Sequence, residues 1–153
     1  MKENYIMKLT LLEQKSQKLE EELKGIGQQI NELALLKEDI KKIKESKEDE
    51  MLSGLGKGIF IKTKMLEREF VVNVGSNILL KKSPAQVLEL IEEQVKQLSE
   101  MKTKVVDEIE ETNINLERLV EKAKKEAMEI QKEREIETNK KEQGKKKGKK
   151  KSR

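Results

Sequence analysis

Residues 53–84 read SGLGKGIFIKTKMLEREFVVNVGSNILLKKSP, and this stretch decides how the chain folds. It holds four of the eight glycines in the sequence, the only proline and both phenylalanines. On either side of it the sequence is dominated by Lys, Glu, Leu and Ile. Because glycine and proline interrupt helices whereas the flanking residues favour them, the pattern predicts two helices separated by a non-helical insert.

Within the insert the apolar residues change from helical spacing to alternation, which is typical of strands. Glycine-rich turns at 54–58 and 75–77 separate these runs, so the pattern predicts two successive β-hairpins rather than a phosphate-binding loop, which would have to open a helix. The four strands are expected near residues 50–54, 58–65, 69–75 and 78–82.

Isolated hairpins of this kind need partners, because a two-stranded sheet is marginal in water and its free edges invite pairing. We therefore expect the strands to pair with the same region of other subunits and to build a β-barrel platform. The residues expected to mediate this subunit assembly are Leu55, Ile59, Ile61, Phe70, Val72, Val74, Ile78 and Leu80.

Apolar residues before and after the insert recur at alternating spacings of three and four, as in a coiled coil. The second run opens with Ser83, Pro84 and Gln86, which form a capping box around a proline suited to the first helical turn. The first seam comprises Leu9, Leu12, Ser16, Leu19, Leu23, Ile26, Ile30, Leu33, Lys37 and Ile40, and the second comprises Leu88, Ile91, Val95, Leu98, Lys102, Val105, Ile109, Thr112, Leu116, Leu119 and Ala123.

The two seams match in length, which favours an antiparallel hairpin within one chain over separate oligomeric coiled coils. This pairing would place Leu88 near Lys44 and Leu9 near Ala123. The fold class is therefore α+β: a long antiparallel helical hairpin with two central β-hairpins. Four seam positions are polar: Ser16, Lys37, Lys102 and Thr112. They are interpreted as positions that set the register of the two helices, with the lysine side chains reaching outward to solvent.

Composition limits the possible functions. Charged residues make up 42% of the chain and aromatic residues 2%, and the absence of cysteine and histidine removes disulfides, imidazole catalysis and the usual zinc ligands. No apolar run approaches the roughly 18 residues of a membrane span, and the N-terminus does not resemble a signal peptide, so a cytoplasmic protein is expected. Paired glutamates lie on solvated helix faces, so neither an enzyme nor a cofactor is expected.

The basic charge of the chain is concentrated at its C-terminal end. Residues 140–153 carry nine Lys or Arg and one Glu, whereas the rest of the chain carries 25 basic and 29 acidic residues. We expect one domain over 1–139, with a helix at about 5–46, hairpins at about 50–82 and a helix at about 84–137, followed by a basic disordered tail at 140–153.

The order of these elements, with LGKGIFIKTKM in one hairpin and FVVNVGSNILLKKSPAQV running from the other into the helix cap, resembles the α-class subunit of prefoldin, especially the archaeal kind. The resemblance covers about residues 5–130, but not the lysine-rich tail. It implies a hexamer of two α and four β subunits that holds unfolded proteins without ATP and delivers them to a group II chaperonin. Contact with these client proteins would lie towards the free ends of the helices.

The free ends of the predicted helices carry more apolar groups than a single two-helix seam can bury, and flexible side chains of this kind can adapt to varied partners. The expected client-binding residues are Tyr5, Ile6, Met7, Leu9, Leu11, Leu12, Met128 and Ile130.

Two alternatives to the hexameric chaperone stay open. The same strand edges could build a filament from a prefoldin-like paralogue. The lysine tail could instead contact nucleic-acid phosphates, but no aromatic residue is interleaved with the lysines for base stacking, so a tail that improves solubility or attracts acidic clients is preferred.

Overall fold

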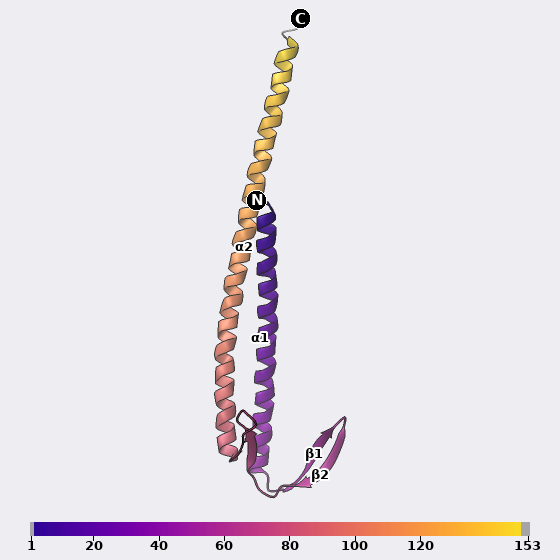
Figure 1. The fold of residues 1–153 in the computed structure, drawn as a ribbon, viewed down its shortest axis with the longest axis vertical. Helices are drawn as coiled ribbons and strands as arrows, with labels where there is room; N and C mark the ends of the chain where they lie inside the picture. The colour runs from indigo at the N-terminus through magenta and orange to yellow at the C-terminus, as the bar shows by residue number, and fades with distance from the viewer. Residues whose placement is uncertain (1, 151–153) are drawn as a thin grey trace. The chain divides into compact units, whose positions relative to one another are not determined.

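A computed structural model describes residues 2–150 of the chain, in which two long helices flank four strands (Figure 1). The strands form two separate antiparallel sheets, β1 with β2 and β3 with β4, which confirms the predicted pair of hairpins. In the part of the chain described here, no helix is long and apolar enough to cross a membrane. The elements in order are α1 (Lys2–Glu45), β1 (Glu50–Gly56), β2 (Ile59–Lys64), β3 (Phe70–Asn73), β4 (Leu79–Lys82) and α2 (Pro84–Lys150).

The chain divides into two compact units, each of which contains part of both helices. Unit 1 combines Met1–Glu21 with Val106–Arg153, and unit 2 is Glu22–Val105. The two units are described separately below.

In unit 2 the end of α1 packs antiparallel against the start of α2. Ile40, Val87 and Ile91 form a buried cluster between them, and Phe70 and Val72 of β3 pack against this cluster. The start of α2 is fixed by the predicted capping box, because the Gln86 amide donates to Ser83 Oγ at 3.3 Å and the Ser83 amide donates to Gln86 Oε1 at 3.0 Å. The cap and the cluster together place the hairpin β3–β4 on the helices.

Both hairpin turns use left-handed backbone conformations. Lys57 and Gly58 join β1 to β2 with φ values of 50° and 77°. Ser76 and Asn77 join β3 to β4 with φ values of 50° and 59°. Paired residues with positive φ match the right-handed twist of adjoining strands, which explains why glycine and asparagine occur at these turns.

In unit 1 the start of α1 lies alongside the later part of α2. The pairing is antiparallel, since Lys15 Nζ lies 3.9 Å from Glu108 Oε2 while Tyr5 contacts Glu126 further along α2. Leu19 and Thr112 are buried, and the Thr112 hydroxyl donates to the Glu108 carbonyl one turn earlier at 2.7 Å. Thr112 therefore satisfies its own hydrogen-bonding group, which permits a polar residue at a buried seam position.

The predicted seams agree closely with the observed burial. Every predicted seam residue of α1 is buried or half-buried, and in α2 the exception is Lys102, which is exposed. The heptad pattern therefore identified the contact faces of the two helices correctly.

The C-terminal part of α2 differs from the expectation. We expected the helix to end near 137 and a disordered tail over 140–153, whereas α2 continues as a helix to Lys150; residues 151–153 lie outside the described residues. Lysine and glutamate are good helix formers, and extending a helix avoids the cost of nucleating one. Lysines in the last turns also interact favourably with the helix dipole.

Replacing Gly25 and Gly27 by Ala is expected to raise the free energy of unfolding by about 1 kcal/mol per site at most. Both glycines lie inside α1, and nothing comes within 4 Å of where either Cβ would stand. Urea unfolding followed by circular dichroism at 222 nm measures the change. Gly75→Ala serves as a control that should be destabilising, because Gly75 has a φ of +112°. A lower midpoint for Gly25→Ala/Gly27→Ala would contradict the prediction.

Candidate functional site

The hairpin β1–β2 exposes apolar side chains on both of its faces. Ile59 and Ile61 point to one face, whereas Phe60 points to the other, where its ring lies beside Gly54, the residue opposite it on β1. The irregular register between Gly54 and Gly56 leaves Leu55 exposed at the end of β1. A two-stranded ribbon with two uncovered apolar faces is only marginally stable in water, so this geometry favours contact with another chain.

The hairpin β3–β4 has one covered face and one open face. Phe70 and Val72 face the helices, whereas Val71 is 62% exposed on the opposite face, as is Leu79 on the partner strand. Phe70 and Val72 are among the predicted assembly residues, and in the single chain both are half-buried and pack against the Ile40 cluster of unit 2. Alternate residues of a strand point to opposite faces, and the buried Ile40 cluster takes this pair.

The other predicted assembly residues are exposed, and the sequence analysis missed several that resemble them. Where consecutive residues of a strand are all apolar, no alternation of apolar and polar residues marks the buried face. The sequence alone therefore could not assign the faces of these strands. The exposed predicted residues are Leu55, Ile59, Ile61, Val74, Ile78 and Leu80, and the missed exposed residues are Met51, Leu52, Phe60, Val71 and Leu79.

Charged side chains connect the segment between the hairpins to its surroundings. Arg68 Nη1 donates to the Ile43 carbonyl at 2.6 Å, which satisfies one of the free carbonyls at the end of α1, and Arg68 Nη2 lies 3.6 Å from Asp49. Lys81 of β4 donates to Glu67 at 3.2 Å, which raises the pKa of the Lys81 ammonium. Arg68 therefore anchors the segment between the hairpins to the end of α1.

A groove of about 200 Å³ lies in unit 1, where α1 begins beside α2, and we call it the Tyr5 groove. Four of the predicted client-binding residues, Tyr5, Ile6, Leu9 and Ile130, contribute to it. The groove brings Leu9 and Ala123 together, in agreement with the predicted register. It is lined by Tyr5, Ile6, Leu9, Ala123, Glu126, Ala127 and Ile130.

The remaining predicted client-binding residues do not line the Tyr5 groove. Met7, Leu11 and Met128 are exposed, with Met7 68% accessible, whereas Leu12 is half-buried in the seam. The three exposed side chains can contact another molecule, whereas Leu12 stabilises the helix pair.

Two residues that line the Tyr5 groove, Tyr5 and Glu126, contact each other across the helix pair. The Tyr5 hydroxyl donates to Glu126 Oε1 at 2.7 Å. This hydrogen bond raises the pKa of Tyr5 above its ordinary value of 10.0, and partial desolvation and the carboxylate charge add to the effect. The neutral phenol is therefore favoured when the two helices are paired. The contact stabilises the pair below about pH 10 and is lost as the pH rises through the raised pKa.

Titration of Tyr5 followed by absorbance at 295 nm should give a midpoint above 10.0. The signal is unambiguous, because the chain has one tyrosine and no tryptophan. Glu126→Gln should lower the midpoint, since it removes the carboxylate that accepts the hydrogen bond. Glu121→Gln, at an exposed position of α2, should leave it unchanged. A wild-type midpoint that does not fall in Glu126→Gln would show that the contact is absent in solution.

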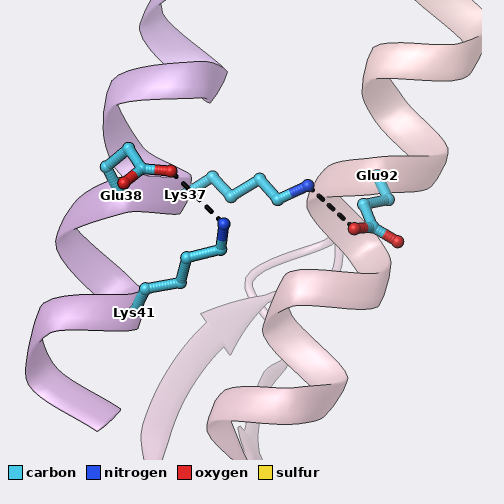
Figure 2. Close-up of polar contacts among 4 residues, drawn as sticks. All are labelled: Lys37, Glu38, Lys41 and Glu92. Atoms are coloured by element: carbon cyan, nitrogen blue, oxygen red, sulfur yellow. Dashed lines mark hydrogen bonds and ion pairs between the residues drawn. The ribbon is translucent and has the colours of Figure 1, made fainter. Parts of the chain in front are cut away.

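Unit 2 carries two apolar grooves that share Leu33, Leu36 and Gln94. One, of about 430 Å³, also includes Met101, and the other, of about 400 Å³, reaches Val71 of β3. Beside them Lys37 reaches from α1 to α2 and donates to Glu92 at 2.8 Å, while Lys41 donates to Glu38 at 3.3 Å (Figure 2). The Lys37 contact lowers the pKa of Glu92 and joins the two helices across the seam, where the lysine ammonium points to α2 rather than outward (Figure 2).

No group of three or more His, Cys, Asp or Glu side chains able to hold a metal ion occurs within the described residues. The surfaces that the described residues offer to other molecules are the apolar hairpin faces, the grooves of the helix pairs and the exposed helix ends.

These features define a class of protein, a coiled-coil subunit whose paired helices are joined through two β-hairpins. The family described as Prefoldin subunit matches residues 12–127, and the chain belongs to the prefoldin family.

Several archaeal relatives agree with this assignment. The chain is 36% identical over 112 residues to prefoldin subunit alpha of Methanococcus maripaludis strain C7, which covers 72% of this chain and 76% of the relative. It is 30% identical over 132 residues to prefoldin subunit alpha of Methanococcus vannielii, covering 86% and 89% respectively. A cryo-EM structure of filamentous PFD from Methanocaldococcus jannaschii has a similar fold, with a TM-score of 0.66 at 22% identity over 73% of this chain and 94% of that one.

Proposed function

We propose that the chain is the α-type subunit of an ATP-independent chaperone, which captures unfolded proteins in the cytoplasm and passes them to a group II chaperonin. Prefoldin family proteins are chaperone subunits, and the relatives named above are α subunits. The observation that carries the proposal is the set of exposed apolar side chains in unit 1 at and beside the Tyr5 groove. These are Ile6, Met7, Leu11, Met128 and Ile130.

The exposed set suits the capture of unfolded chains because it is apolar, flexible and open. Methionine and aliphatic side chains can repack against many sequences, since none of them requires a particular hydrogen-bonding partner. Contacts of this kind are weak singly. Several copies in one assembly would bind the same client jointly, because binding at one copy raises the effective concentration of the client at the others.

The hairpins would supply that assembly. The uncovered faces of β1–β2 and the open face of β3–β4 support pairing with β-type prefoldin subunits, in a hexamer of two α and four β chains whose strands close into a barrel. Burial of Leu55, Ile59 and Ile61 in such an interface would stabilise the assembly by about 25 cal/mol for each Å² of apolar surface that is removed from water.

A filament built from this chain is the second candidate. The observation in its favour is the similar fold of the filamentous PFD structure from Methanocaldococcus jannaschii. The same hairpin faces would serve in either assembly, so the partner decides the outcome. Sedimentation velocity of the chain alone and with a β-type subunit separates the candidates. A closed hexamer that requires the β-type subunit supports the chaperone assembly, and a ladder of large species from the chain alone supports the filament.

Replacing Ile6, Met7 and Leu11 by Ser is expected to spare assembly and to weaken capture of an unfolded client by about tenfold. These side chains are exposed, so the helix pair loses little when they are removed. The measurement is suppression of aggregation of a denatured client by the assembled complex. The matched control replaces Leu35, Val106 and Val120 by Ser. These are three exposed apolar residues of the helices that line none of the grooves described above, and this variant should capture the client as the wild type does. Equal activity of both variants and the wild type would contradict the proposed client site.

A further inference from the structure

Among the residues that the structure describes, the segment of α2 that follows the Tyr5 groove packs against no other element. Figure 1 shows α2 running on beyond the start of α1, and its side chains from 131 to 149 are exposed. Its first part still carries apolar groups, because Ile130 and Ile136 are exposed. Its later part is basic.

Within residues 140–149 six lysines accompany a single acidic residue, Glu142. None of these lysines forms an ion pair among the described residues. Successive helical positions turn by about 100°, so Lys145, Lys146 and Lys147 point to different sides of the helix. The segment is therefore a cationic rod rather than a basic stripe that faces one surface.

We propose that unit 1 binds unfolded clients in two parts, with the Tyr5 groove and its exposed neighbours taking an apolar stretch and lysines 140–149 taking an acidic stretch of the same client. The inference rests on the proposed function and names a client class: unfolded chains in which acidic residues follow or precede apolar ones. Charge complementarity supplies the second contact, and linkage to the first raises its effective concentration.

The geometry of α2 sets the spacing in the client. Ile130 and Lys145 are 15 positions apart, which corresponds to about 22 Å along a helix. An extended client chain advances about 3.3 Å per residue, so about six or seven client residues span that distance. Apolar and acidic stretches separated by a linker of this length should bind best.

A polypeptide fits this surface better than nucleic acid. Exposed Met128, Ile130 and Ile136 lie on the same helix as the lysines, and their apolar side chains have no charge or hydrogen-bond donor that could bind a phosphate. No aromatic residue occurs between 128 and 150 to stack on bases. The client is therefore expected to bring apolar side chains together with carboxylates.

The test compares two unstructured fluorescent peptides that share an apolar half and a linker of about six residues and end in either five Glu or five Gln. Wild-type protein should bind the Glu peptide about tenfold more tightly at low salt, and the preference should disappear at about 1 M salt. Replacing Lys145, Lys146, Lys147 and Lys149 by Gln should abolish the preference and leave binding of the Gln peptide unchanged. The matched control replaces Lys24, Lys44, Lys96 and Lys104 of unit 2, so that both variants lose the same charge.

The outcomes separate this inference from the proposed function. Two results would overturn the two-part site and leave the chaperone role intact. The first is equal binding of both peptides by the wild type, and the second is a preference for the Glu peptide that survives in the variant without the four lysines. Failure to bind either peptide or to suppress aggregation would overturn both. A duplex DNA oligonucleotide that binds the wild type more tightly than the Glu peptide and displaces it would also overturn the inference, in favour of a nucleic-acid surface.

Discussion

Replacing Ile59 and Ile61 by Glu is expected to dissociate the assembly into single chains that keep their helices. Both side chains lie on one face of β2 and are 61% and 49% exposed in the single chain. If this face is covered in the assembly, each carboxylate would be buried without a partner, which costs several kcal/mol per group. Two such groups exceed what one strand contact can offset.

The measurement is the mass of the wild type and of the variant by analytical ultracentrifugation, alone and with a β-type subunit. Circular dichroism of the variant should retain the helical signal, because neither residue contacts the buried Ile40 cluster. The control Val106→Glu/Val120→Glu adds the same charge at exposed positions of α2 and should assemble normally. An unchanged mass for the Ile59 variant would show that β2 does not lie in the subunit interface.

Replacing Ile91 by Ala should lower the free energy of unfolding by about 2–5 kcal/mol. Ile91 is 4% exposed and packs with Ile40 and Val87 in the cluster that holds α1, α2 and β3 together. The described part of the chain has few fully buried apolar residues, so a cavity here removes a large share of its packing. Domains of ordinary stability have about 5–15 kcal/mol in total, so partial unfolding of unit 2 is expected.

Urea unfolding measures this loss at one fixed chain concentration, since assembly adds to the apparent stability. Neighbouring residues of β3 offer a matched pair. Val72→Ala should destabilise unit 2 because Val72 packs on the cluster, whereas Val71→Ala should have little effect on a single chain because Val71 faces outward. Equal midpoints for the two valine variants would show that the assigned faces of β3 are wrong.

The two valines also show where the sequence stops being informative. The run Phe70-Val71-Val72 is apolar at every position, and a shift of one residue would exchange the two faces of the strand. The sequence therefore predicted the strand but not which side packs on the helices. The structure decides this through the Ile40 cluster, which covers Phe70 and Val72 and leaves Val71 open.

The end of α2 and the position of Arg68 illustrate a second limit. The dense positive charge at 140–153 predicted a disordered tail, yet the helix continues to Lys150 because its residues only need to extend an existing helix. The Arg68 contact with the Ile43 carbonyl joins residues that are 25 positions apart, and no local pattern indicates such a pair.

The sequence by itself determined the two helices, their contact faces, the capping box at Ser83 and the pair of hairpins. These features depend on spacing and on residue types within a few positions of each other, which a linear pattern records directly. Only the tertiary structure decided which hairpin faces stay open, how Tyr5 meets Glu126 and where the Tyr5 groove forms. Those features arise when distant side chains compete for the same buried space, and that competition has no signature in the local sequence.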